Sequence, residues 1–412
     1  MARPDHLVQL GGTEGVLAAD RVVEFVERRF DELDLDGRSL CLVIPDATRQ
    51  CPLPLLLGAI LRSVEGRVSS CRAVVALGTH APMAPDELRR LVGTDRLDVV
   101  NHEWWEDATY VHLGELSADD VARWSDGRLA EAVPIRVNRH VVDAEVTVIV
   151  GPVLPHEVIG FSGGHKYLFP GLSGPELIDV THWLGALITS SAIIGTPGIT
   201  PVRAMVEAAA DLVPGERHAL CLVVQQGSGD VEHLAFGDVR SAWAAAADVA
   251  ARTHVVHLDA PVQRVVSLVS ERYDELWTGA KGFYKVEPVV ADGGEVILYA
   301  PHIERIAVTH PGIERIGYHC RDWFLAHWDE VQHLPRGELA HSTHLFGAGT
   351  YDPVAGERGR VRVTLATGIP EATTRAVNLG YLDPAHLDLA AYEADPDTLV
   401  VHDAGEVLYR LR

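Results

Sequence analysis

The strongest constraint on the fold is the regular alternation of short, continuous apolar runs with helical segments. Strands buried on both faces read as unbroken Val/Ile/Leu runs, whereas half-exposed strands alternate with polar residues. Helices are predicted at 52–66 and 85–93, and both begin with proline, which helices tolerate in the first turn. The runs between them predict an α/β fold with a mostly parallel sheet covered on both faces. The strands expected in this part are SLCLVIPD (39–46), RAVVALGTH (72–80), EVTVIVGPVLPH (145–156) and HALCLVVQQ (218–226).

A second set of strands begins near Val255. RVVSLVS (264–270), EVILYAP (295–301) and VRVTLAT (361–367) are the expected members. The tail TLVVHDAGEVLYRL (398–411) is predicted to be a hairpin turning at DAGE. We therefore expect two α/β domains, with mostly parallel sheets and an active-site cleft between them. The predicted domains are 1–255 and 256–395. The hairpin 396–412 is expected to pack either on the second domain or back on the first.

Composition excludes several classes of function. The 35 basic and 58 acidic residues give a net charge of −23, which argues against nucleic acid and anionic membranes as partners. No apolar run approaches the roughly 20 residues of a membrane span, and MARPDHLVQL lacks the apolar stretch of a signal peptide. The five cysteines include no CxxC pair. A reducing, cytoplasmic location is therefore expected, without disulfides or a thiolate zinc site.

Polar residues follow three of the predicted strands at the point where each ends. They are Asp46-Ala47-Thr48-Arg49, Gly78-Thr79-His80 and Pro155-His156. Ligands of open α/β sheets bind outside the carboxyl ends of the strands. Each residue alone has an ordinary alternative, such as a helix cap for Asp46 or a loop histidine for His80. Because all of these residues are expected at one edge of the sheet, they favour an active site there. The two histidines suit a reaction that needs an acid and a base on opposite faces of a carbon.

A glycine-rich loop, GFSGGHK (160–166), follows the third strand. The Walker phosphate loop requires Gly before its Lys and Ser or Thr after it, but His165 and Tyr167 occupy those places here. The loop therefore presents Lys166 for another purpose. His182 lies in the helical stretch 174–189 and is a candidate single imidazole ligand for nickel, copper or zinc. With no HxxxH or HxH partner on that helix, further ligands must come from elsewhere, a cofactor being one source.

These motifs resemble, in order and spacing, those of the nickel-pincer lactate racemases. The matching stretches are DATR (46–49), GTH (78–80), PHEVIGFSGGHK (155–166), PG (170–171) and His182. The resemblance implies a cofactor-binding first domain, in which Lys166 carries a pyridinium-3,5-bisthiocarboxylic acid mononucleotide as a thioamide. This group and His182 would hold nickel, and Asp46, Ala47, Thr48 and Arg49 would hold the nucleotide.

The resemblance also implies an activity, that of an isomerase acting on 2-hydroxy acids. One of His80 and His156 would take the hydroxyl proton while hydride passes to the pyridinium ring, which gives a keto acid. Hydride return to the other face, with a proton from the second histidine, would invert the centre. The cofactor would carry the difficult step. Enzymes that make the cofactor and insert nickel would be the protein partners.

The second domain carries the expected substrate contacts. ELWTGAKGFYK (275–285) resembles the family's substrate segment, with Trp277 at the aromatic position, Thr278 in place of Gln and Lys281 as the partner of a carboxylate. HLPRGELAHSTHLFG (333–347) lacks the tryptophan expected for a lactate pocket. Because a methyl pocket has no use for many polar groups, the substrate is expected to be larger or more polar than lactate, such as a sugar acid or a malate-type acid. The polar residues of this segment are Arg336, Glu338, His341 and His344.

Two other classes of function agree less well with these residues. A metal-dependent hydrolase or lyase would use His80, His156 and Asp46 around zinc, but no HExxH or HxH motif occurs and Lys166 would have no role. A non-catalytic protein that sequesters nickel or a pyridinium metabolite would have no need of two histidines at separate strand ends.

Overall fold

The computed structural model describes residues 7–412, with the exception of the side chain of Asp403. The chain divides into two compact units. Among the described residues, unit 1 comprises 7–154, 161–178 and 197–253, and unit 2 comprises 155–160, 179–196 and 254–412. The last crossing of the chain from unit 1 to unit 2 follows Thr253, and two short segments upstream of it also group with unit 2.

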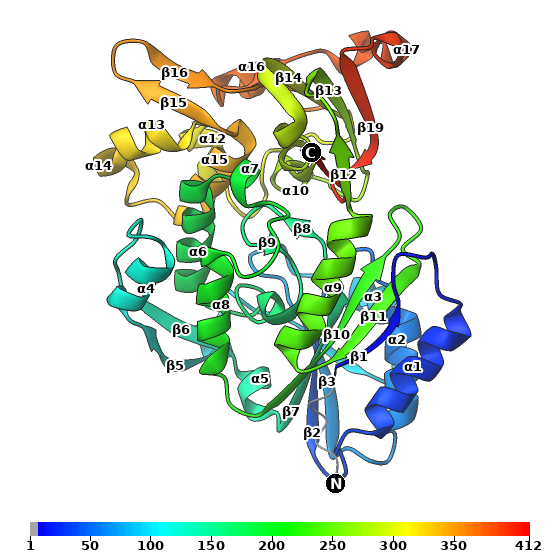
Figure 1. Cartoon of the computed structure of the whole chain (residues 1–412). Helices are drawn as coiled ribbons and strands as arrows, with labels where there is room; N and C mark the ends of the chain where they lie inside the picture. Colours follow the sequence, from blue (N-terminus) through cyan, green and yellow to red (C-terminus); the bar gives the residue numbers. More distant parts are fainter. Residues whose placement is uncertain (1–6) are drawn as a thin grey trace. The chain divides into compact units, whose positions relative to one another are not determined.

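Unit 1 is built on a seven-stranded sheet with the order β1-β11-β10-β7-β2-β3-β4 (Figure 1). The five strands from β10 to β4 are parallel, and β11 and β1 add antiparallel to one edge. All the strands predicted for this domain are confirmed. The predicted strands are β2 Ser39–Ile44, β3 Ser70–Val75, β7 Val146–Pro152 and β10 Glu216–Val224. The sheet also contains three strands that were not predicted, β1 Val8–Gly11, β4 Asp98–Asn101 and β11 Val231–Gly237.

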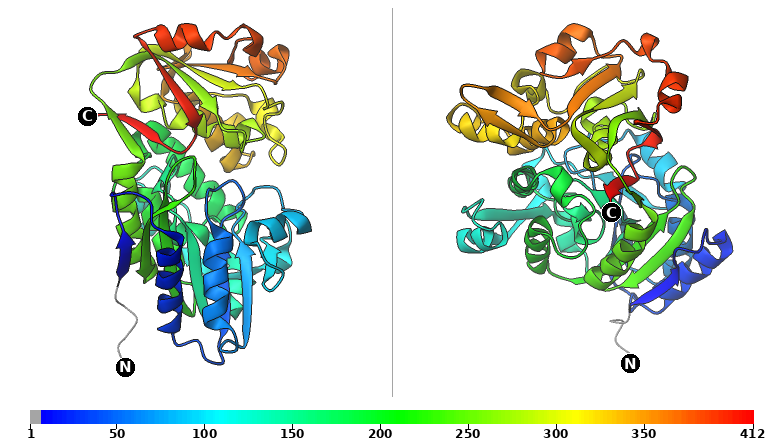
Figure 2. Two further views of the ribbon diagram at one scale, coloured as in Figure 1. Left: turned by 90° about the vertical axis from the view of Figure 1, so that its right-hand side faces the viewer. Right: turned by 45° about the horizontal axis from the view of Figure 1, so that its top comes forward.

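Helices cover this sheet because each buries an apolar stripe on it. Helices α1 (Ala19–Asp31) and α2 (Leu53–Val64) pack together, and their buried Phe30 and Ile60 share one core with Leu42 of β2. Helix α9 (Val239–Thr253) packs on β10 and β11 (Figures 1 and 2). The unit also contains α3 Pro85–Val92, β5 Tyr110–Leu116, α4 Ala118–Trp124, β6 Val133–Asn138, α5 Arg139–Asp143, the 3-10 turn η2 Gly164–Tyr167 and α8 Pro201–Asp211.

Unit 2 has a five-stranded, fully parallel sheet with the order β18-β17-β14-β13-β19. Its strands are β13 Val262–Val269, β14 Val290–Ala300, β17 Arg362–Thr367, β18 Gly380–Tyr381 and β19 Thr398–Ala404. The short ribbon of β15 (Gly349–Asp352) and β16 (Gly356–Gly359) is antiparallel. The helices of this unit include α10 Leu276–Gly279, α11 Lys281–Tyr284, α12 Gly312–Ile316, α14 Trp328–Val331 and α15 Arg336–Phe346. The mostly parallel α/β class is thus confirmed in both units.

The predicted C-terminal hairpin is wrong. Strand β19, red in Figure 2, pairs in parallel with β13, whereas β20 (Leu408–Leu411) pairs in parallel with β12 (Val255–Leu258). The connection between the two strands is bonded to Lys285, whose Nζ donates to Glu406 O at 2.7 Å. Both strands belong to unit 2, so the tail does not return to the first domain. A strand, turn and strand pattern shows where strands begin and end but not which strand each one pairs with.

Within residues 7–412, no helix combines the length and the apolar character that a membrane span would require.

Candidate functional site

The loops after β2 and β3 meet at the carboxyl edge of the unit 1 sheet, as the sequence predicted. Asp46 follows β2 and is almost completely buried, and His80 follows the neighbouring β3. His80 Nδ1 lies 2.5 Å from Asp46 Oδ2. The other oxygen, Asp46 Oδ1, accepts from the backbone N–H and the hydroxyl of Thr48 at 3.1 and 2.5 Å. The carboxylate is therefore fully engaged by the protein.

The groups around this pair keep the Asp46 carboxylate ionised. Burial by itself raises the pKa of Asp46, but His80, Thr48 and Arg49 together hold it well below its ordinary value. An ionised carboxylate only accepts hydrogen bonds, so Nδ1 of His80 carries the proton. This leaves Nε2 of His80 as the nitrogen that can accept a proton, the arrangement of a general base oriented by a carboxylate.

The glycine loop is anchored by a wholly buried arginine of α8. Arg203 donates to the carbonyl oxygens of Phe161 at 2.6 Å and Gly163 at 3.2 Å, and its guanidinium lies over Trp243, 4.0 Å from the ring centroid. Gly163 and Gly164 adopt φ of +83° and +58°, and a Cβ on Gly163 would lie 2.5 Å from Val153. Only glycine fits there without strain. Half-buried Lys166 sits on η2 directly after this fixed backbone.

The GTH loop is bonded to Gly171, whose own N–H donates to Lys166 O at the end of the glycine loop at 3.2 Å. Gly78 N donates to Gly171 O at 2.9 Å, and Trp104 Nε1 holds the carbonyl of His80 at 3.0 Å. Tyr167 lies against Gly151 of β7, where any Cβ would overlap the phenol ring. Tyr167 was not predicted as part of the site. Of the predicted residues, unit 1 thus brings together Asp46, Ala47, Thr48, Arg49, His80 and the loop carrying Lys166, with Ala47 exposed.

The remaining predicted residues belong to unit 2, including two that the sequence placed in the first domain. His156 lies in β8 (Pro155–His156), and His182 is half-buried on α6 (Pro175–Ile188). Their segments contact other parts of unit 2. A Cβ on Gly185 would lie 3.1 Å from Val158, and Arg410 donates to Ile194 O at 3.0 Å. The sequence could not show the second contact, because Arg410 lies 216 positions from Ile194.

His156 is held differently from His80. Its Nδ1 accepts from the backbone N–H of Val158 at 3.1 Å, so in the neutral ring the proton is on Nε2. Glu157 Oε2 lies 3.5 Å from the same nitrogen. Burial raises the pKa of Glu157, but Lys281, a backbone N–H, His344 and Lys285 outweigh it and hold that pKa below its ordinary value. Glu157 was missed from the sequence, although it directly follows His156.

The predicted substrate segment is largely buried. Lys281 Nζ donates to Thr278 O at 3.4 Å and lies 5.2 Å from the ring centroid of Tyr273. The Thr278 hydroxyl donates to Glu275 O at 3.2 Å, within its own turn. Trp277 lies between two imidazoles, with ring centroids 4.0 Å from His310 and 4.3 Å from His341. Lys281 and Glu157 thus belong to one buried charged cluster of unit 2.

Within residues 7–412, no group of three or more His, Cys, Asp or Glu side chains is arranged to hold a metal.

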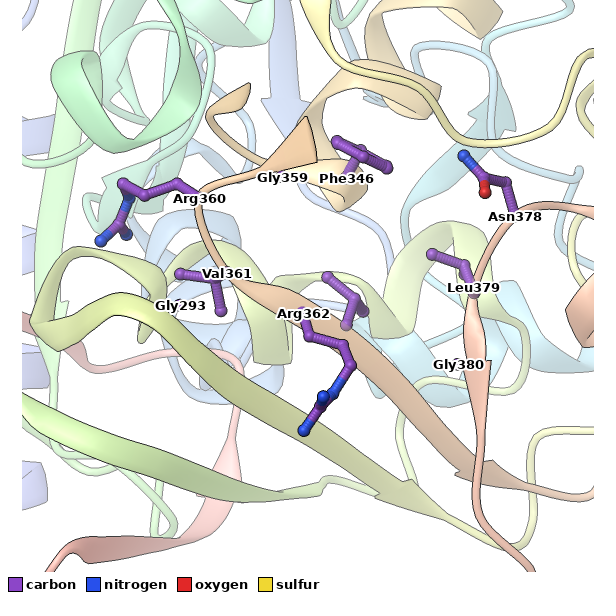
Figure 3. A pocket seen from close by; sticks show the side chains of 10 residues that line it. Gly293, Phe346, Gly359, Arg360, Val361, Arg362, Asn378, Leu379 and Gly380 are labelled. Atoms are coloured by element: carbon purple, nitrogen blue, oxygen red, sulfur yellow. The ribbon is translucent and has the colours of Figure 1, made fainter. Parts of the chain in front are cut away.

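A hollow in unit 2 of about 290 Å³ contains none of the predicted site residues (Figure 3). Its two arginines are used by the fold. Arg360 donates to Val290 O and Glu287 O at 2.7 and 2.6 Å, and Arg362 pairs with Glu295 at 3.0 Å. Figure 3 shows their side chains extending in different directions, so they do not form a shared anion site.

Fold and site define an α/β protein that presents a lysine on an anchored glycine loop and a carboxylate–histidine pair at its strand ends. Residues 20–195 match the family model described as the lactate racemase N-terminal domain. The lactate racemase of Lactiplantibacillus plantarum is 26% identical over 156 residues, and that of Thermoanaerobacterium thermosaccharolyticum is 24% identical over 159. These matches cover 37% and 38% of this chain and 34% of each relative, so the chain aligns with about a third of their length.

Solved structures extend the similarity to the whole chain. A crystal structure of a protein from Thermotoga maritima has a TM-score of 0.90 and 31% identity, covering 98% of this chain and all of the other. The lactate racemase apoprotein from Thermoanaerobacterium thermosaccharolyticum shares the fold, with a TM-score of 0.74 and 18% identity over 96% of this chain and 95% of the other. Residues 20–195 thus belong with the lactate racemase N-terminal domains, and the whole chain shares the fold of the lactate racemase apoprotein.

Proposed function

We propose that this protein is a racemase or epimerase of 2-hydroxy acids that works with a nickel-pincer nucleotide attached to Lys166. The observation that carries the proposal is the His80–Asp46 pair, placed by β2 and β3 beside the loop that presents Lys166. The match of residues 20–195 to the lactate racemase N-terminal domain supports the same reaction class. Neither a hydrolase nor a storage protein accounts for a lysine on so firmly anchored a loop.

The residues present fit a pyridinium-3,5-bisthiocarboxylic acid mononucleotide with bound nickel. Lys166 would carry it, His182 would supply one imidazole ligand, and Ala47, Thr48 and Arg49 would bind the nucleotide, Arg49 as a charged donor to phosphate. When bound, the group accepts and returns hydride, which no side chain can do. Asp46 was predicted among the nucleotide-binding residues. Because both its oxygens are engaged by Thr48 and His80, we assign it to the positioning of His80 instead.

His80 and His156 would perform the proton transfers, but in unequal ways. His80 accepts the hydroxyl proton at Nε2, and the resulting imidazolium is stabilised by Asp46. His156 presents Nε2–H and donates to the substrate oxygen while Val158 N–H occupies Nδ1. To give up its Nε2 proton, His156 must first be protonated on Nδ1 as well. Glu157, 3.5 Å from Nδ1, favours this protonation, and the Val158 N–H that donates to Nδ1 opposes it.

Substrate recognition would rest on unit 2. Lys281 would pair with the substrate carboxylate next to the reacting carbon, and Trp277 and Thr278 would contact the substrate. Of the polar residues that favoured a substrate larger than lactate, His341 is already satisfied by two tyrosine hydroxyls, Tyr284 and Tyr318. His344 still supports that preference. The enzymes that make the cofactor and insert nickel would be required partners, because nothing in this chain synthesises it.

The test is to produce the protein with and without co-expressed cofactor-making enzymes and nickel. We expect an adduct of mononucleotide size on Lys166 by intact mass, and turnover of 2-hydroxy acids by chiral chromatography, only in the loaded preparation. Lys166→Ala is the control and should be folded, free of adduct and inert. Robust epimerase activity from an adduct-free preparation would overturn the proposal.

A further inference from the structure

Helix α15 buries two histidines in different ways. His341 and His344 are three residues apart and both are almost inaccessible, at 5% and 3% exposure. His341 uses both ring nitrogens, with Tyr284 OH 3.2 Å from Nδ1 and Tyr318 OH 3.3 Å from Nε2. Neither nitrogen of His344 has a hydrogen-bond partner among residues 7–412. A buried polar group without partners is unfavourable, and such groups recur where a ligand completes their bonds.

The surroundings of His344 define what such a ligand can be. Burial lowers the pKa of His344 to about 4, so near neutral pH the ring offers one N–H donor and one nitrogen acceptor without charge. Glu157 and His182 are close enough to act on it electrostatically. Lys281 and Lys285 hold the pKa of Glu157 below its ordinary value, so Glu157 is a charged acceptor. The Tyr284 ring packs edge-on to the imidazole, with centroids 5.9 Å apart.

A hydroxyl group fits these partners better than a methyl or a second carboxylate. A hydroxyl donates one hydrogen bond and accepts others, so it can give its proton to Glu157 and accept from His344. A methyl group would leave both imidazole nitrogens unpaired. A second carboxylate only accepts, would be repelled by Glu157 and would gain no charge pairing from a neutral imidazole.

We infer that His344 and Glu157 bind a hydroxyl group beyond C2, which makes a polyhydroxy monocarboxylic acid of the sugar-acid class the substrate. This inference rests on the proposed function and selects between the two polar substrate classes that the sequence left open. Lys281 then pairs with the single carboxylate, and His344 is the residue that determines specificity.

The experiment compares three substrates with the loaded wild-type enzyme and with His344→Phe. The substrates are a six-carbon aldonic acid, 2-hydroxyhexanoate of the same chain length, and malate. We expect the wild type to favour the aldonic acid. His344→Phe should lower its kcat/KM by roughly 10- to 100-fold and that for 2-hydroxyhexanoate by less than about threefold, because only the first loses a hydrogen bond. His344→Gln, which keeps an amide donor and acceptor, should retain more of the preference.

A second readout needs neither cofactor nor substrate. The midpoint temperature of unfolding of His344→Phe should equal or exceed that of the wild type, because the substitution removes no hydrogen bond. The matched control His341→Phe should unfold at a lower temperature, because it leaves the hydroxyls of Tyr284 and Tyr318 without their partner. A lowered midpoint for His344→Phe would show that the imidazole is already paired and would overturn the inference.

The remaining outcomes separate the two proposals. Equal losses for the aldonic acid and 2-hydroxyhexanoate, or malate as the best substrate, would overturn the role of His344 and leave the racemase assignment standing. No turnover of any 2-hydroxy acid by wild type carrying the Lys166 adduct would overturn the proposed function, and the inference with it.

Discussion

Asp46→Asn tests the assignment of Asp46 as the residue that orients His80. The substitution preserves shape and an oxygen acceptor for the Thr48 N–H, but it removes the charge 2.5 Å from His80 Nδ1. An amide can donate to Nδ1, which shifts the ring proton to Nε2 and blocks the base. A hydrogen bond to a charged group contributes about 1.5–3 kcal/mol. That corresponds to roughly 10- to 150-fold in rate, and misplacing the proton raises the expected loss toward about 10⁴-fold.

The assay is kcat in both directions on loaded enzyme, together with intact mass to show that the Lys166 adduct is retained. Asp46→Asn combined with His80→Ala should be no slower than His80→Ala alone, because the two residues act as a unit. Nitrogen NMR of the unloaded protein should show the ring proton of His80 on Nδ1 in the wild type and on Nε2 in the variant. Near-normal turnover in Asp46→Asn, or additive losses in the double variant, would refute the reasoning.

Three further outcomes follow from the structure. His80→Ala and His156→Ala should each reduce turnover by about 10²-fold or more with the adduct intact, and a variant retaining near-normal rates would identify its histidine as structural. His182→Ala should lose nickel and keep the organic adduct, as elemental analysis and intact mass would show; unchanged nickel would exclude His182 as a ligand. The free energy of unfolding should fall as the pH drops from about 6.5 toward 4. In this range His344 is protonated in the unfolded chain but stays neutral in the folded protein, where its pKa is about 4. In urea titrations, His344→Phe should lose about 1–3 kcal/mol less unfolding free energy over this pH range than the wild type. The same pH dependence in both proteins would contradict the lowered pKa of His344.

The sequence predicted the unit 1 site because its determinants are local. Apolar runs locate the parallel strands, and a parallel sheet brings the strand ends to one edge, so Asp46 and His80 had to be neighbours. The bond between them was beyond prediction, since it depends on the conformations of two loops. The grouping of His156 and His182 with unit 2, and the separate partners of β19 and β20, depend on pairings between distant segments, about which a linear pattern holds no information.

The interleaved course of the chain limits how this protein can be dissected. Residues 155–160 and 179–196 are bracketed in sequence by unit 1, yet they group with unit 2, where Arg410 of the last strand holds Ile194. A fragment ending at 195, where the family match ends, or at 255 would carry both segments without the chain that packs against them. Such a fragment should expose apolar surface and aggregate. Exchange of substrate specificity between homologues by recombination would accordingly require three segments to move together, whereas a single crossover near 255 would produce a mismatched core.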